Sequence, residues 1–125
     1  MKKTRRLEDY LKSIYLISIN NEEGISRVKD IAKLMDVKTA TVVYALKRLN
    51  KMGMINQKPY GYVTLTEKGL KESKKIIEKF NVLFEFYNKI LNISKETAFQ
   101  DACKAEHIIS EETFEKMSQY LERGK

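Results

Sequence analysis

The sequence contains little cysteine, proline or glycine, and it has no long hydrophobic run. Its 125 residues include one Cys, one Pro and five Gly, a composition typical of a helix-rich soluble protein. One cysteine cannot form an internal disulfide, so Cys103 is a core thiol, a metal ligand, a reactive group or an intermolecular bridge. Charged residues such as Glu8 and Asp9 interrupt the stretch after the basic start, and no run approaches membrane-spanning length. We therefore expect the protein to remain in the cytoplasm.

The sequence motifs of common enzymes are also missing. There is no Gly-rich phosphate loop and no G-x-S-x-G turn. Because the chain has one His, Cys103 and His107 form the only possible thiol–imidazole nucleophile pair, and nothing nearby in the sequence supplies an evident oxyanion hole. We therefore expect no enzymatic activity.

Positive charge is concentrated in the first half of the chain. Residues 1–66 contain 13 Lys and Arg against 6 Asp and Glu, whereas residues 67–125 contain 11 of each. The whole net charge of +7 thus lies in the first part. Such asymmetry is typical of a surface that contacts nucleic-acid phosphates. We predict a DNA-binding domain over residues 1–66 and a helical domain over residues 67–125. The alternative is a small α+β core with a solvated basic face.

Hydrophobic spacing in the first half predicts three helices and a hairpin. Residues 7–17 form the first helix, Ser26 caps a second that ends at the turn of Asp36, and Thr39 caps a third. Two alternating segments follow, residues 54–57 and 62–65, joined by a turn. Two helices around a tight turn followed by a hairpin are typical of a winged helix-turn-helix, whose second helix enters the major groove.

The third helix is the candidate recognition helix because it has two distinct faces. Its apolar residues recur on one side and its polar residues on the other. The inward face consists of Val42, Ala45, Leu46 and Leu49, and the outward face of Thr41, Tyr44, Lys47 and Arg48.

A long amphipathic helix is predicted to begin at Thr66. Apolar residues over 76–91 recur with a 3.6-residue period, and Val82 and Phe86 belong to a second stripe beside the first. We expect one stripe to face a second copy of the chain, because two-fold operators match homodimers. The alternative is that apolar residues between 99 and 121 cover both stripes. The predicted fold is mainly α with a small β-hairpin, a winged helix-turn-helix followed by a helical dimerisation lobe.

The candidate chemistry lies near the end of the chain. On a helix, side chains at i, i+3 and i+4 are neighbours, so Cys103, Glu106 and His107 would share one face. A thiolate, a carboxylate and an imidazole together suit iron, zinc, cobalt or nickel, and added carboxylates favour manganese. The alternative is structural, since a buried Cys more often packs in a core and a Glu-His pair is common without metal.

Segments along nearly the whole chain match one known family in order. They begin with Leu7-Glu8-Asp9-Tyr10-Leu11, continue through residues 27–32, 49–55 and 59–69, and end with Cys103-x-x-Glu106-His107. In these segments the chain resembles the DtxR/MntR family of metal-dependent transcriptional repressors, and its short length resembles the manganese-regulator branch without the SH3-like domain. The resemblance implies a homodimer whose metal site bridges the N-terminal helix and the helical lobe and sets the separation of the recognition helices.

The resemblance also implies a set of metal ligands. Asp9 falls on the family's ligand in the N-terminal helix, and Cys103, Glu106 and His107 fall on the helix that supplies further ligands. The implied cofactor is a divalent transition metal, Mn²⁺ or Fe²⁺ first, with Zn²⁺, Co²⁺ and Ni²⁺ as alternatives.

Two positions depart from the family pattern. Lys12 stands where the manganese branch places a carboxylate, and Asn81 stands where a ligand histidine is usual. Asn81 still offers a neutral oxygen, and Glu85, one turn later, offers a carboxylate. Three outcomes are open: a single site of four ligands, an altered site for another metal, or a regulator without metal dependence.

The predicted partner is double-stranded operator DNA. A protein-interaction module is the alternative, which the basic excess of the first half disfavours. No Asn or Gln lies in the exposed start of the recognition helix, so methyl contacts to thymine and DNA shape are expected to contribute to readout. The groove-facing residues are Lys38, Thr39, Ala40, Thr41 and Tyr44, and the phosphate contacts are Arg27, Lys47, Arg48 and Lys58.

Overall fold

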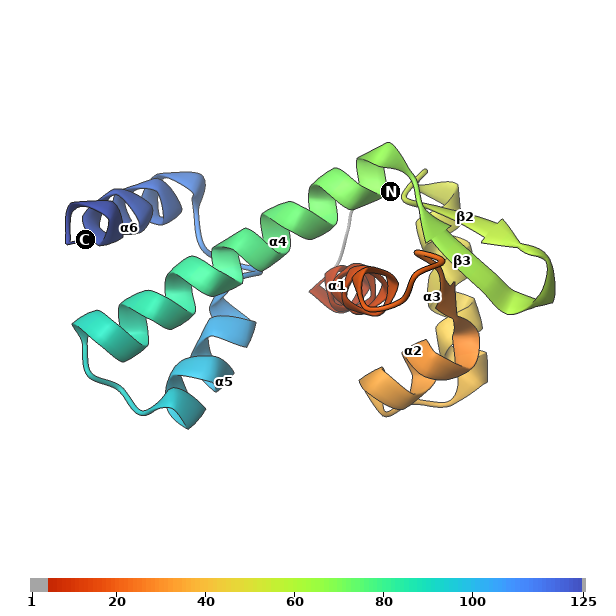
Figure 1. The fold of residues 1–125 in the computed structure, drawn as a ribbon, viewed down its shortest axis with the longest axis horizontal. Helices are drawn as coiled ribbons and strands as arrows, with labels where there is room; N and C mark the ends of the chain where they lie inside the picture. Colours follow the sequence, from red (N-terminus) through yellow and green to blue (C-terminus); the bar gives the residue numbers. More distant parts are fainter. Residues whose placement is uncertain (1–4, 125) are drawn as a thin grey trace. The chain divides into compact units, whose positions relative to one another are not determined.

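The computed structural model describes residues 5–124, except for the side chain of Tyr60. It confirms a mainly helical fold with a small sheet (Figure 1). These residues form two compact units, with the boundary between Lys74 and Lys75 inside a long helix. None of the helices in this range is long and apolar enough to cross a bilayer. The elements are α1 (Arg5–Ile19), β1 (Ser26–Arg27), α2 (Val28–Met35), α3 (Thr39–Lys51), β2 (Ile55–Lys58), β3 (Tyr62–Leu65), α4 (Glu67–Glu85), α5 (Lys95–Ala105) and α6 (Glu111–Arg123).

The first unit contains a three-stranded antiparallel sheet with β3 between β1 and β2. Strands β2 and β3 form the predicted hairpin, joined by a 3-10 turn over Pro59–Gly61. The third strand corrects the prediction of a two-stranded wing. Strand β1 is only two residues long, too short to show alternation in the sequence. It places Ser26 opposite Val63 and Arg27 opposite Tyr62.

Neither predicted cap of the two short helices is correct. Ser26 lies in β1, where its buried Oγ donates a hydrogen bond of 3.0 Å to the carbonyl oxygen of Ile14. Helix α2 begins after Arg27, and α3 begins after Lys38, so Thr39 is the first residue of α3. Neither of these helices has a side-chain hydrogen bond at its N-cap. Strand pairing and burial at Ser26 outweigh its preference for a cap.

The core of the first unit confirms the predicted inward faces. Helix α2 ends at Asp36, whose left-handed φ of 55° turns the chain toward α3, and Asp tolerates this conformation better than most residues. All four residues of the predicted inward face of α3 are buried. The core of this unit comprises Leu7, Tyr10, Leu11, Ile14, Ile31, Ala32, Val42, Ala45, Leu46, Leu49, Met54, Ile55 and Val63.

Helix α4 begins where predicted and changes character near its end. Thr66 caps it, accepting a hydrogen bond of 3.0 Å from the backbone N–H of Gly69. After Glu85 the chain continues as a π-helix over Phe86–Ile90, in which Leu91 donates to the carbonyl oxygen of Phe86. The sequence predicts an uninterrupted helix here, because a π-helix keeps the apolar residues close to their α-helical spacing.

In the second unit, α5 and α6 pack against the C-terminal part of α4 and the π-helix that follows it (Figure 1). The ring of Phe80 meets that of Phe99 edge-on at 5.3 Å, and Phe86 meets Tyr120 at 5.8 Å. Both packed helices have serine caps, Ser94 and Ser110. Apolar surface nevertheless remains, since Leu91, Phe99, Ile108 and Tyr120 are exposed.

Candidate DNA-binding surface and metal centre

Helix α3 presents its predicted groove-facing residues to solvent. Tyr44 has 68% of its surface exposed, and Lys38, Thr39, Ala40 and Thr41 are exposed at the start of the helix. This exposure follows from the pattern of the helix, because its apolar residues occupy the other face. Base edges in a major groove could therefore be reached by these side chains.

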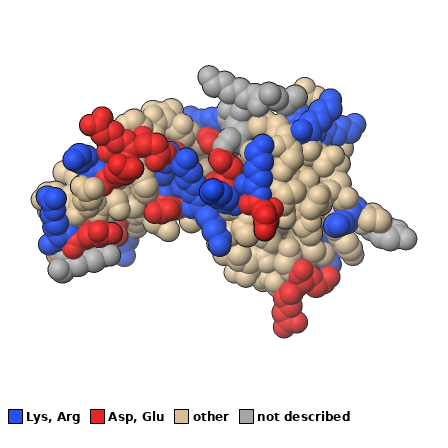
Figure 2. Space-filling view, turned by 90° about the horizontal axis from the view of Figure 1, so that it is seen from above, with Lys and Arg blue, Asp and Glu red and all other residues tan. Residues whose placement is uncertain are grey.

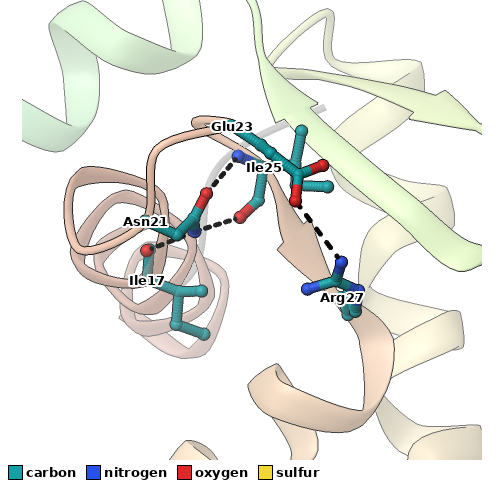
Figure 3. Close-up of polar contacts among 5 residues, drawn as sticks. All are labelled: Ile17, Asn21, Glu23, Ile25 and Arg27. Atoms are coloured by element: carbon teal, nitrogen blue, oxygen red, sulfur yellow. Dashed lines mark hydrogen bonds and ion pairs between the residues drawn. The ribbon is translucent and has the colours of Figure 1, made fainter.

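Arg27 is positioned by two neighbours. Its guanidinium carbon lies 4.9 Å from the ring centroid of Tyr62, which is its partner in the β1–β3 register. One of its terminal nitrogens lies 3.8 Å from a carboxylate oxygen of Glu23 (Figure 3). An arginine that stacks on an aromatic ring loses less conformational freedom on binding a phosphate than an arginine without such a contact. The role of Tyr62 could not be predicted from the sequence, because it depends on the register of a two-residue strand.

The loop before Arg27 is held by Asn21. The side-chain amide of Asn21 donates to the carbonyl oxygens of Ile17 and Ile25, at 2.8 and 2.7 Å, and its oxygen accepts a hydrogen bond from the N–H of Ile25 (Figure 3). These bonds close the turn between α1 and β1. This turn fixes where the chain enters β1 and therefore where Arg27 lies.

The basic charge is distributed over several groups of side chains. On the face shown in Figure 2, blue Lys and Arg side chains are separated by red carboxylates and tan surface. Among the remaining predicted phosphate contacts, Lys47 and Lys58 are exposed and Arg48 is half-buried. Lys58 ends β2 next to the turn of the hairpin. Exposed Lys and Arg side chains of this kind are suited to contacts with phosphates.

The second unit brings two of the predicted metal ligands together. His107 Nε2 lies 3.6 Å from Glu106 Oε1, and the exposed fractions of the two side chains are 2% and 1%. The prediction that Cys103, Glu106 and His107 share one face assumes a helix that continues to residue 107. Helix α5 ends at Ala105, so Glu106 and His107 lie just after it. Glu106 keeps helical dihedral angles, φ −58° and ψ −24°, so the turn continues the helix. Cys103 is half-buried in the last turn of α5.

The remaining candidate ligands lie on α4 and α1. Asn81 is exposed on α4, and Glu85, half-buried at its end, pairs with Lys89 at 3.6 Å. In the first unit, Asp9 and Lys12 line one side of a hollow of about 340 Å³ between α1 and α2. Lys12, which stands at a usual ligand position, thus borders the same hollow as Asp9.

A winged helix-turn-helix whose recognition helix, α3, is exposed to solvent defines a DNA-binding regulator. The model of the iron dependent repressor N-terminal DNA binding domain matches residues 2–63, and that of the iron dependent repressor metal binding and dimerisation domain matches residues 66–125. The chain therefore belongs to the family of iron-dependent repressors, which confirms the resemblance to the DtxR/MntR regulators. The matched domains make DNA and a second copy of the chain its partners.

Similar proteins agree with this family. The chain is 37% identical over 122 residues to an uncharacterized HTH-type transcriptional regulator of Methanocaldococcus jannaschii, covering 98% of this chain and 97% of that protein. It is 28% identical to the HTH-type transcriptional regulator MntR of Lysinibacillus sphaericus, covering 95% of this chain and 84% of that protein. These relatives are transcriptional regulators, and its membership of the repressor family makes this chain a regulator and not an enzyme.

A solved structure supports the same fold. The crystal structure of ScaR with bound Zn²⁺ has a TM-score of 0.78 and 28% identity, over 93% of this chain. The match covers 53% of the ScaR chain, so this chain spans about half the length of that regulator.

Proposed function

We propose that the chain is a metal-responsive repressor of metal-homeostasis genes that binds operator DNA as a homodimer in the cytoplasm. The observation that carries this proposal is the buried Glu106–His107 pair in a chain whose other unit presents an exposed recognition helix. We place the functional division at residues 66 and 67, where the hairpin ends and α4 begins. A dimer that occupies a promoter represses without any contact to polymerase.

The effector is a divalent transition metal, with Mn²⁺ or Fe²⁺ expected first and Zn²⁺, Co²⁺ and Ni²⁺ as further candidates. A nearby imidazole and carboxylate, both shielded from water, are suitable donors for such an ion. Glu106 and His107 would hold the metal together with Cys103 and Asp9, the last two assigned by family resemblance. The bound cation supplies positive charge that offsets the cost of burying carboxylates. Asn81 and Glu85 are secondary candidates.

The ligand residues of the chain contribute geometry as well as charge. The helical turn after Ala105 directs Glu106, while its neighbour His107 keeps its Nε2 within 3.6 Å of that carboxylate. Such a prearranged pair loses little conformational freedom when it binds an ion. The family resemblance implies that Asp9 joins these ligands, so metal binding would bias the spacing of the recognition helices in the dimer.

DNA binding divides into base reading and phosphate contacts. Bases are read from the start of α3, and phosphates are held by side chains around it. The support is the exposure of the first group and the basic character of the second. Base reading falls to Lys38, Thr39, Ala40, Thr41 and Tyr44, and phosphate binding to Arg27, Lys47, Arg48 and Lys58.

The second candidate function is a regulator of the same fold without metal dependence. The observation in its favour is Lys12, whose side chain borders the hollow that Asp9 also lines. An ammonium beside a cation site opposes metal binding unless its flexible stem directs the charge to solvent. Such a protein would bind its operator equally well in chelator.

Selection from a pool of random duplexes tests the proposed function. The purified full chain would be incubated with the pool in Mn²⁺ or in chelator, and bound duplexes would be sequenced. We expect enrichment of an inverted repeat in Mn²⁺ only, because each protomer of a two-fold dimer reads one half-site. Enrichment under both conditions would support the metal-independent regulator. No enrichment in chelator or with any of the candidate metals would contradict both functions.

A further inference from the structure

A small hollow lies between α1 and the exposed side of α3. Its volume is about 130 Å³. Helix α1 contributes Arg6, Leu7 and Tyr10 to its walls, and α3 contributes Thr41, Tyr44, Ala45 and Arg48. The hollow therefore connects α3, the recognition helix, with α1, which is not among the elements predicted to contact DNA. All of these residues belong to the first unit.

The chemistry of the walls suits a small oxyanion. The guanidinium carbon of Arg6 lies 5.8 Å from the ring centroid of Tyr10, whose side chain is buried in the core and cannot swing away. This cation–π contact directs Arg6 along the edge of the hollow. Arg48 borders the same space from α3. Two guanidinium groups and the hydroxyl of Thr41 favour a phosphate over a cation.

A second hollow continues this basic surface along α3. It has a volume of about 250 Å³ and is lined by Tyr44, Lys47, Arg48 and Lys51. Tyr44 and Arg48 border both spaces. The cationic walls thus extend along the helix that is expected to enter the major groove. A run of phosphates along one DNA strand fits such a surface better than an isolated anion does.

We infer that Arg6 of α1 and Arg48 of α3 together bind one backbone phosphate of the operator. This inference rests on the proposed function and adds α1 to the DNA-binding elements. Asp9, the candidate metal ligand in the same helix, lies three residues after Arg6. A phosphate bound through Arg6 and an ion bound through Asp9 would therefore restrain one helix, and each would favour the other by linkage.

The salt dependence of DNA binding tests this inference with a matched control. The full chain in Mn²⁺ would be titrated onto a duplex from its own upstream region at several salt concentrations. Arg6→Gln is compared with Arg5→Gln, which removes the same charge from a neighbouring residue that does not line the hollow. Loss of one phosphate contact lowers the slope of log K against log salt by about 0.9. We expect part of that loss for Arg6→Gln, because Arg48 still contacts the phosphate, and little change for Arg5→Gln.

A double variant tests whether the two arginines share a phosphate. If they do, each single change leaves one arginine on the phosphate and lowers the slope by less than about 0.9, whereas Arg6→Gln combined with Arg48→Gln lowers it by about 0.9. A fall of about 1.8 would show two separate phosphates and overturn the shared contact.

The failures of this inference and of the proposed function can be distinguished. If the unmodified chain binds in Mn²⁺ but the Arg6→Gln and Arg5→Gln slopes are equal, only the role of Arg6 is overturned. If the unmodified chain does not bind this duplex or any duplex selected from the random pool, the proposed function fails and this inference fails with it. Thermal unfolding of each variant verifies that a lower slope belongs to folded protein.

Discussion

The imidazole of His107 and the carboxylate of Glu106 lie together with almost no exposed surface, their nearest nitrogen and oxygen being 3.6 Å apart. Burial makes an ionised carboxylate costly, so cationic neighbours at such a position stabilise the fold. In a family whose second domain binds metal, this pair is the part of the candidate centre that the second unit supplies by itself.

Glu106→Gln should weaken metal binding. Glutamine keeps the size of the side chain but removes the charge that attracts a cation. We expect the dissociation constant for Mn²⁺ or Fe²⁺ to rise at least about tenfold. Changes to residues that only contact metal ligands already weaken metal binding by about tenfold or more, and a direct ligand should matter at least as much. Competition with a fluorescent chelator measures it. Glu96→Gln, an exposed change in the first turn of the same helix, is the control and should leave the affinity unchanged. Equal affinities in the two variants would remove Glu106 from the site.

Gly69→Ala should destabilise the first unit. A Cβ on Gly69 would overlap the backbone carbonyl of Met54, which cannot turn away as a flexible side chain could. Alanine favours a helix by up to about 1 kcal/mol over glycine, but overpacking typically costs about 1–3 kcal/mol, so we expect a net loss. Urea unfolding measures it. In Gly124→Ala the added Cβ would meet only ordinary van der Waals contacts, at 3.7 Å, and stability should change by less than about 0.5 kcal/mol. A neutral Gly69→Ala would show that α4 can shift away from Met54.

Glu111 should give the second unit an acid-sensitive contribution to stability. A hydrogen bond from Lys79, followed by the positive charges of Lys79 and Lys75, holds the pKa of Glu111 below its ordinary value of 4.5. A carboxyl whose pKa is depressed in the folded state stabilises it above the unfolded pKa, and this contribution disappears as pH falls through the folded pKa. The stability difference between the unmodified chain and Glu111→Gln should therefore be present at neutral pH and shrink below pH 4.5.

The size of the Glu111 effect is limited by its exposure. Salt should reduce the stability difference at neutral pH, because the side chains of Glu111 and Lys75 are both exposed to solvent. A difference that grew as the pH fell would contradict the assignment. Thermal unfolding at a series of pH values measures it.

Tyr10→Phe should be neutral or stabilising. The hydroxyl of Tyr10 is buried and has no hydrogen-bond partner among residues 5–124. Removing a buried polar group without a partner recovers its desolvation cost, up to about 1–3 kcal/mol. Tyr10→Ala, which also removes the ring, should cost about 3–5 kcal/mol by the precedent of large aromatic truncations. A loss of more than about 1 kcal/mol in Tyr10→Phe would show that the hydroxyl is hydrogen-bonded.

Most helices could be predicted because their apolar residues recur with the helical period. The inward face of α3 and the start of α4 at Thr66 are correct for this reason. Strand β1 could not be predicted, since two residues have no detectable period. Without this strand in the prediction, Ser26 is assigned the wrong role. A cap is a local preference, whereas the hydrogen bond from Ser26 to Ile14 depends on packing between distant segments.

The candidate sites were predictable to a different extent. The exposure of Tyr44 follows from the two faces of α3. The support that Tyr62 gives to Arg27 requires the strand register, and the hollow beside Arg6 requires the packing of α1 on α3. Spacing alone also suggests that Cys103, Glu106 and His107 share a helical face, although α5 ends before the last two.

Fluorescence anisotropy on DNA from the chain's own upstream region tests metal-dependent repression most directly. The purified protein would be titrated in chelator, in Mn²⁺, in Fe²⁺ without oxygen and in Zn²⁺, with a scrambled duplex as the control. We predict sequence-specific binding that tightens with at least one of these metals and is lost in chelator. Tight, specific binding that is unchanged by chelator and by every metal would contradict the sensing role and leave Glu106 and His107 as a structural pair.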